Sequence, residues 1–215
     1  MNKTALIVGI TGQDGSLLGK YLLSKGYKVY GATRDSSTCN KSRLNTLNIT
    51  GDIEFISLAP NDFRSVLKVI DYCQPNEIYY LAGLTSVGLS FEQPVECTES
   101  ISGGTLNFLE AIKFLNKKIK FFNAGSSECF GNTNKIAANE LTAFSPRSPY
   151  ATAKSTAFWQ VANYREAYNL SCCTGILGNH ESPLRANHFV TQKIILGVKR
   201  IKEGITDKLK LGNLN

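Results

Sequence analysis

Two side chains in the stretch "SPYATAK" are of types that could move a proton during a reaction. Tyr150 and Lys154 follow a proline suited to the first turn of a helix, and residues four apart share one helix face. An ammonium group beside a phenol favours the phenolate, lowering a phenol pKa that ordinarily lies near ~10. A phenolate could take a hydroxyl proton while a hydride leaves the same carbon. Because this spacing also arises by chance, the other elements must decide its meaning.

A second group of reactive side chains follows the apolar run "IKFF". The segment "AGSSECFG" places Ser126, Ser127 and Glu128 where a buried strand is expected to end. Glu128 is either an ordinary acid in a surface turn or a carboxylate that the strand delivers to a reaction. The second interpretation requires a cofactor and a base at the same edge of the fold.

A glycine-rich turn indicates such a cofactor. The segment "GITGQDG" spaces Gly9, Gly12 and Gly15 directly after an apolar run and at the start of a helical pattern. Glycine lets the backbone approach a pyrophosphate at the helix N-terminus, where free N–H groups and the helix dipole favour anions. We predict a dinucleotide site here; the alternative is a tight turn without a ligand.

The end of the second strand bears on the choice of dinucleotide. The segment "TRDSS" contains Arg34, Asp35, Ser36 and Ser37. A guanidinium followed by hydroxyls favours NADP, since it can pair with a 2′-phosphate. Asp35 keeps NAD as the alternative, because an acidic residue at this point typically binds a free ribose.

Apolar runs alternate with amphipathic stretches along the chain. Strands are predicted at 4–10, 28–33, 53–59, 77–83, 119–125 and 172–178, and helices at 16–25, 62–73, 95–117, 150–168 and 189–202. This order predicts an α/β fold: a doubly wound, Rossmann-type parallel sheet with helices on both faces. Residues 1–178 would form the dinucleotide-binding domain with the catalytic residues, and residues 179–215 would begin a substrate-binding region.

The predicted sheet brings the reactive residues together. Ligands of open parallel sheets bind beyond the carboxyl ends of the strands. The glycine turn, Thr85 and Ser86, the segment containing Glu128, and Asn179 all follow predicted strands. We therefore expect them to lie along one edge.

Composition narrows the class of protein. The chain has 215 residues, of which 42% are hydrophobic and 19% charged, and a formal charge of +7. No apolar run approaches the ~20 residues of a membrane helix. The basic residues are scattered rather than clustered with aromatics, which disfavours nucleic-acid binding and suits a polyanionic small molecule. Six cysteines without a CxxC pair or metal-ligand spacing predict no metal site and a reducing, cytoplasmic location.

Several segments together resemble one known family. "GITGQDG", "SVGLSFEQP", "AGSSECFG", "PRSPYATAK", "NYREAY", "GILGNHESPLR" and "FVTQKI" are similar to the GDP-mannose 4,6-dehydratases of the extended short-chain dehydrogenase/reductase superfamily. The glycine turn and the YxxxK pair are superfamily-wide, whereas "NHESPLR" followed by "FVTQKI" is more specific. The resemblance covers essentially the whole chain.

The resemblance implies dehydration of GDP-mannose to GDP-4-keto-6-deoxymannose with tightly bound NADP as the internal hydride carrier, on the route to GDP-fucose. Tyr150, tuned by Lys154, would be the base for oxidation at C4, and Ser126 would bind the C4 oxygen. Glu128 would remove the C5 proton and assist loss of the C6 hydroxyl, after which hydride returns to C6.

Further binding roles come from the same resemblance. Substrate contacts are implied for Thr85, Ser86, Glu128, Asn179 and Lys193. Cofactor contacts are implied for Gly9, Thr11, Gly12, Gln13, Asp14, Gly15, Arg34, Ser36, Leu81, Ala82, Tyr150, Lys154 and His180.

The sequence departs from the family pattern at several points. Gly178 stands where relatives commonly have an aromatic residue, Ala59-Pro60 where many have an adenine-binding aspartate, and "LTS" (84–86) where "QSH" is common. Asp62, near the missing aspartate, is predicted to cap a helix instead.

The length of the chain also departs from the pattern. Family members continue past residue 215, so we expect a fragment, a truncated product or one half of a split protein. Such a chain would be a homo-oligomer or would pair with a complementing C-terminal chain. The alternatives to a dehydratase are a related sugar-nucleotide epimerase or reductase, and an NADP-binding remnant without turnover.

Overall fold

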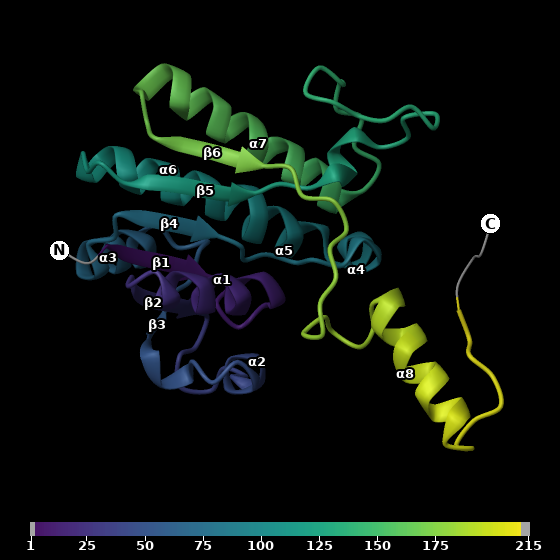
Figure 1. Cartoon of the computed structure of the whole chain (residues 1–215). Helices are drawn as coiled ribbons and strands as arrows, with labels where there is room; N and C mark the ends of the chain where they lie inside the picture. Colours follow the sequence, from purple (N-terminus) through teal and green to yellow (C-terminus); the bar gives the residue numbers. More distant parts are fainter. Residues whose placement is uncertain (1–2, 212–215) are drawn as a thin grey trace. The chain divides into compact units, whose positions relative to one another are not determined.

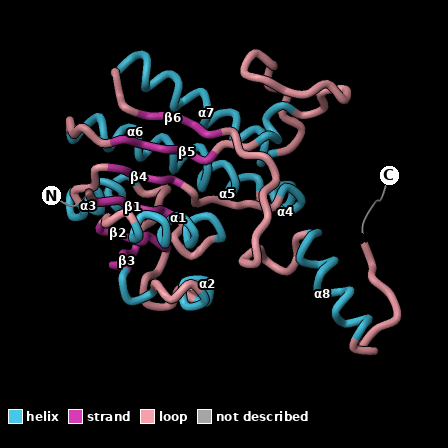
Figure 2. Tube along the Cα trace, viewed as in Figure 1, coloured by secondary structure: helices cyan, strands magenta, loops and turns pink. Residues whose placement is uncertain are grey.

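The computed structural model describes residues 3–211, which divide into two compact units between Gly178 and Asn179. Helices and strands alternate through the first unit (Figure 2), which contains all six strands of the sheet. Within the described residues, no helix combines the length and the apolar character needed to cross a membrane. The assignment of the second unit to substrate binding stays a prediction.

The first unit is built on a parallel sheet in the order β3-β2-β1-β4-β5-β6 (Figure 1). Its strands are β1 (Thr4–Val8), β2 (Lys28–Thr33), β3 (Ile53–Ser57), β4 (Glu77–Tyr80), β5 (Lys120–Ala124) and β6 (Cys172–Gly175). The chain runs outward from β1 to β3, then returns and continues through β4 on the other side. The order reverses between β1 and β4, which is where open α/β sheets bind ligands. The predicted doubly wound fold is confirmed.

Helices pack on both faces of this sheet. They are α1 (Gln13–Ser24), α2 (Ser42–Thr46), α3 (Phe63–Cys73), α4 (Val87–Glu92), α5 (Pro94–Thr98), α6 (Gly104–Leu115) and α7 (Pro149–Tyr168), with 3-10 turns η1 (Thr50–Asp52) and η3 (Ser127–Phe130) and a π-helical turn, η2 (Glu99–Gly103). The second unit contains α8 (Val190–Lys202).

Alternation along β1 explains why both faces are covered. Leu6 and Val8 point into a core shared with α3, α6 and α7, while Ala5 and Ile7 pack in a second core with α1 and α2. All four side chains are at most 2% exposed. A strand with apolar side chains on both faces is stable only between two layers of helices.

The observed bounds correct several predicted ones. Helix α1 starts at Gln13 rather than 16, so the last residues of the glycine turn form its first turn. Strands β1, β3, β4 and β6 end earlier than predicted and β5 is one residue shorter at each end, which leaves 9–10, 58–59, 81–83, 119, 125 and 176–178 outside the strands. The predicted helix at 95–117 is divided by η2, and the short helices α2 and α4 were not predicted. Asp62 caps α3 as expected: its side chain accepts a bond from the Arg64 amide.

Candidate functional site

A cavity of about 530 Å³ lies beyond the carboxyl ends of β1, β2, β3 and β4. Its walls come from the loops that follow these strands and from the helical segment after α4. The lining residues are Val8, Gly9, Thr11, Gly12, Ala32, Thr33, Arg34, Leu58, Ala59, Pro60, Asn61, Leu81, Ala82, Gly83, Thr85, Glu96 and Ser100. The cavity therefore contains the glycine turn and the end of the second strand, the two features expected to bind a dinucleotide.

The glycine turn brings backbone to the floor of the cavity. The Gly12 amide donates to the Gly9 carbonyl (3.0 Å), and Gly12 is the N-cap of α1. A Cβ at Gly15 would lie only 2.2 Å from the Gly9 oxygen, so α1 can start this close to β1 only with glycine there. The arrangement leaves a cradle of backbone at the N-terminus of α1, which suits a pyrophosphate.

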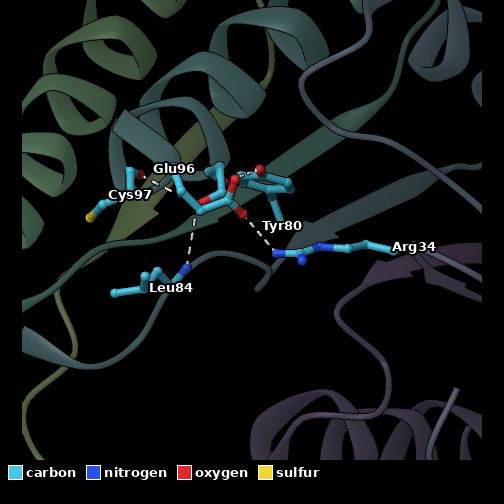
Figure 3. Close-up of polar contacts among 6 residues, drawn as sticks. Arg34, Tyr80, Leu84, Glu96 and Cys97 are labelled. Atoms are coloured by element: carbon cyan, nitrogen blue, oxygen red, sulfur yellow. Dashed lines mark hydrogen bonds and ion pairs between the residues drawn. The ribbon is translucent and has the colours of Figure 1, made fainter. Parts of the chain in front are cut away.

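The side chains after β2 are engaged with protein partners. The Arg34 guanidinium pairs with the Glu96 carboxylate, with 2.8 Å between Nη2 and Oε1 (Figure 3). The Ser36 amide donates to the Ser57 hydroxyl at 3.0 Å. Asp35 accepts bonds from the Ser37 and Thr38 hydroxyls, which hold the pKa of its carboxyl well below its usual range, at about 2. This region thus presents both a cation and carboxylates to a ligand.

Helix α7 positions the predicted acid–base pair. The Ser148 hydroxyl accepts from the Ala151 amide at 3.1 Å and Pro149 occupies the first helical position, so the helix starts just before Tyr150. Lys154 is buried, and its ammonium donates to the Ala124 carbonyl at the end of β5 (2.6 Å). The distance from Lys154 Nζ to the Tyr150 ring centroid is 5.8 Å.

Burial dominates the titration of this pair. Burial raises the pKa of Tyr150, a hydrogen bond with Ser126 opposes this effect, and the charge of Glu128 adds to the rise. We expected Lys154 to lower this pKa; in the chain by itself, removal from solvent outweighs any such effect. Burial also lowers the pKa of Lys154, to about 8.

Ser126 and Glu128 lie beside the same pair. Ser126 follows β5, is 7% exposed, and accepts from the Glu128 amide at 3.2 Å as the N-cap of η3. Glu128 sits on this turn with an exposed side chain. Its charge acts on Tyr150, so the two groups are electrostatic neighbours. The structure therefore brings Ser126, Glu128, Tyr150 and Lys154 together at the β5 and α7 end of the sheet edge.

The remaining predicted residues divide into four sets. Thr85, Leu81 and Ala82 line the cavity with the glycine turn, whereas Gln13, Asp14, Gly15 and Ser36 do not. Ser86 caps α4 by accepting from the Leu89 amide at 3.2 Å. Asn179, His180 and Lys193 belong to the second unit, where all three are exposed. Their binding roles stay predictions.

Sequence reasoning missed several residues at the cavity. Glu96 faces Arg34 from α5, and Asn61 lines the wall next to Pro60. Arg43, on α2, donates to the Thr11 carbonyl at 3.0 Å and so stabilises the glycine turn. The "TRDSS" segment indicated Arg34 as a cofactor ligand, but no local pattern connected Arg34 with Glu96, 62 residues away.

A family model described as GDP-mannose 4,6 dehydratase matches residues 6–215. GDP-mannose 4,6 dehydratase 1 of Arabidopsis thaliana is 45% identical over 222 residues, covering 99% of this chain and 61% of that protein. GDP-mannose 4,6-dehydratase of Vibrio cholerae serotype O1 is 43% identical, covering 99% of this chain and 59% of that protein. The chain thus spans about three fifths of the length of these relatives.

Solved structures share the fold at lower identity. A UDP-glucose 4-epimerase from Thermus thermophilus, in complex with NAD, superposes with a TM-score of 0.80 at 23% identity, covering 94% of this chain and 63% of that one. A dTDP-glucose 4,6-dehydratase from Bacillus anthracis, also with NAD, gives 0.76 at 20% identity, covering 94% and 62%.

Proposed function

The chain belongs to the GDP-mannose 4,6-dehydratase family, and we propose that it converts GDP-mannose to GDP-4-keto-6-deoxymannose and water. The observation that carries this proposal is the meeting of Ser126, Glu128, Tyr150 and Lys154 at one end of the sheet edge that also holds the cavity. A hydroxyl, a carboxylate and a phenol in that arrangement suit a dehydration that needs one acid–base group at C4 and another at C5 and C6.

The cofactor would occupy the cavity beyond β1 and β4. The glycine cradle formed by Gly9 and Gly15, where a side chain would collide with backbone, fits a pyrophosphate, and Arg34 supports a 2′-phosphate and hence NADP. Asp35 and Glu96 support NAD as the alternative. When bound, the nicotinamide supplies a hydride acceptor that later returns the hydride to the sugar.

Tyr150 takes the proton of the C4 hydroxyl in this proposal. Because burial raises its pKa, the phenol is neutral in the chain by itself, so turnover should increase as the pH rises from neutrality toward the pKa of Lys154, about 8, above which loss of the ammonium charge opposes this increase. Lys154, bound to the Ala124 carbonyl, holds a positive charge beneath the phenol and stabilises negative charge that develops there.

Glu128 and Ser126 complete the proton transfers. The exposed Glu128 carboxylate removes the C5 proton once C4 is a ketone, and passes a proton to the departing C6 hydroxyl, which leaves as water. The buried Ser126 hydroxyl donates a hydrogen bond to the C4 oxygen. The proton that Tyr150 took from the C4 hydroxyl is then transferred to C5, so the reaction consumes no net acid or base.

Two alternatives differ in their use of these residues. A simple 4-epimerase has no need of a base at C5, so the position of Glu128 favours the dehydratase over an epimerase or reductase of that kind. A nucleotide-binding remnant would bind NADP without turnover. For the dehydratase and for both alternatives, we infer a cytoplasmic protein, because its six cysteines are free. We also infer that the chain acts as a homo-oligomer or together with a complementing chain.

The test incubates the purified chain with NADP and GDP-mannose and detects the 4-keto product by mass spectrometry. We expect product with the natural chain, a loss of at least ~100-fold with Glu128→Gln, and unchanged turnover with Glu166→Gln, the same charge change on an exposed part of α7. Bound NADP without product would identify the remnant. Full turnover by Glu128→Gln would exclude the proposed role of that carboxylate.

A further inference from the structure

An ion pair joins two walls of the cavity. Arg34 comes from the end of β2 and Glu96 from α5, and both line the cavity. Figure 3 shows the guanidinium extended toward the carboxylate, with 2.8 Å between Nη2 and Oε1. Binding of a 2′-phosphate is expected to depend on Arg34. Glu96 therefore competes directly with such a phosphate for the Arg34 guanidinium.

The backbone that carries Glu96 is held against β4. The Tyr80 hydroxyl donates to the Ser100 carbonyl at 2.6 Å, within η2, and the Leu84 amide donates to the Ser100 hydroxyl at 3.4 Å (Figure 3). A Cβ at Gly104 would lie 1.9 Å from the Tyr80 oxygen, so only glycine permits this approach. The π-helical turn is thereby fixed, and α5 presents Glu96 to the cavity from a defined position.

The charges around Arg34 oppose a phosphate. Asp35 follows Arg34 in sequence and remains ionised, because hydrogen bonds from Ser37 and Thr38 lower its pKa to about 2. Arg34 is thus paired with Glu96, and a second carboxylate follows it in the chain. A phosphate monoester carries about −1.5 to −2 charges near pH 7. A 2′-phosphate would have to displace the Glu96 carboxylate from Arg34, and the displaced carboxylate would then repel the phosphate. A free ribose hydroxyl, in contrast, can donate a hydrogen bond to a carboxylate.

We propose that Glu96 sets the cofactor preference of this site by competing with the 2′-phosphate for Arg34, so that the natural chain discriminates only weakly between NADP and NAD. This inference rests on the proposed function, in which the cavity binds a nicotinamide dinucleotide. The Arg34 side chain is 81% exposed and that of Glu96 44%. Exposed ion pairs are weak, so a ligand can break this one, and Glu96 adjusts the preference rather than excluding one cofactor.

The experiment measures dissociation constants of NADPH and NADH by cofactor fluorescence, for the natural chain, Glu96→Gln and Glu99→Gln. We expect Glu96→Gln to tighten NADPH binding by about 2- to 5-fold, the size expected for removal of one exposed competing charge, and to leave the dissociation constant of NADH unchanged. Glu99→Gln makes the same charge change next to α5, at an exposed residue that does not line the cavity, and should change neither constant. Thermal unfolding of each variant verifies that the fold is retained.

A double substitution separates competition from general electrostatics. In an Arg34→Ala background, Glu96→Gln should improve NADPH binding by less than it does in the natural chain, because no guanidinium remains to be released. An unchanged NADPH-to-NADH ratio in Glu96→Gln, or the same change in Glu99→Gln, would overturn the inference while leaving the proposed site intact. Failure of the natural chain to bind either cofactor would instead refute the proposed function, and this inference with it.

Discussion

Replacing Lys154 by methionine tests how strongly burial acts on an ammonium group at the centre of the site. The side chain is 8% exposed, and its contact with the Ala124 carbonyl (2.6 Å) is a hydrogen bond rather than an ion pair. Burial lowers its pKa from 10.5 to about 8. Between these two values the unfolded chain binds more protons at this lysine than the folded chain does, so the folded state gains stability as the pH rises.

The size of the effect follows from the pKa values. One pKa unit corresponds to ~1.36 kcal/mol, and integration from pH 7 to pH 10 gives about 2.5 kcal/mol for this lysine. Lys154→Met removes the titrating group and keeps an apolar stem. The free energy of unfolding of the natural chain should therefore rise by about 2.5 kcal/mol relative to that of the variant over this range. The difference in unfolding free energy between the natural chain and Lys154→Met at pH 7 alone is less informative than its change with pH. The variant also leaves the Ala124 carbonyl without its donor, at a cost of ~1–3 kcal/mol.

The assay is urea unfolding, followed by circular dichroism, at half-unit steps from pH 7 to pH 10. Val161→Ala is the matched control, since Val161 is buried on the same helix and does not titrate. Its difference from the natural chain should stay constant with pH. Parallel curves for the natural chain and Lys154→Met would refute the conclusion that burial lowers the pKa of this lysine.

Three further predictions concern the cofactor cradle, the base and a helix cap. Gly15→Ala should weaken NADPH binding at least ~10-fold and lower the melting temperature, because its Cβ would lie 2.2 Å from the Gly9 oxygen. Gly88→Ala is the control: its Cβ would have nothing nearer than 4.0 Å, so neither quantity should change. Equal NADPH binding by the two variants would contradict the proposed cradle. Tyr150→Phe should lower turnover at least ~100-fold with little change in NADPH affinity. A loss of both turnover and NADPH affinity would instead indicate a structural role for Tyr150. Asp62→Ala should cost ~1 kcal/mol of unfolding free energy and Asp62→Asn much less, since asparagine can still cap α3; equal losses would exclude the cap.

The class of fold follows from the pattern of apolar residues along the chain. Strands such as β1, with Leu6 and Val8 on one face and Ala5 and Ile7 on the other, are apolar throughout, and amphipathic segments separate them. Only a parallel sheet between helices buries such strands. The glycine turn, the cap at Asp62 and the start of α7 were predictable for the same reason: each depends on a few neighbouring residues.

Element bounds were less predictable. Nothing in the local pattern of 95–117 indicates that the helix is divided by η2, because the cause lies on β4, where the Tyr80 hydroxyl donates to the Ser100 carbonyl, and at Gly104, which leaves room for it. The early start of α1 at Gln13 likewise depends on how closely Gly15 packs on Gly9.

The electrostatics of the site depend on contacts between segments that are far apart in the chain. The sequence indicated Lys154 as the partner of Tyr150, but the ammonium donates to Ala124, 30 residues earlier, and burial controls both pKa values. It indicated Arg34 as a phosphate ligand, but Glu96 reaches the same guanidinium from the far wall of the cavity. Side-chain type and local spacing set which groups are available. Desolvation and long-range partners depend on what the fold packs around these groups, and they decide the pKa values of Tyr150 and Lys154 and the partner that Arg34 meets.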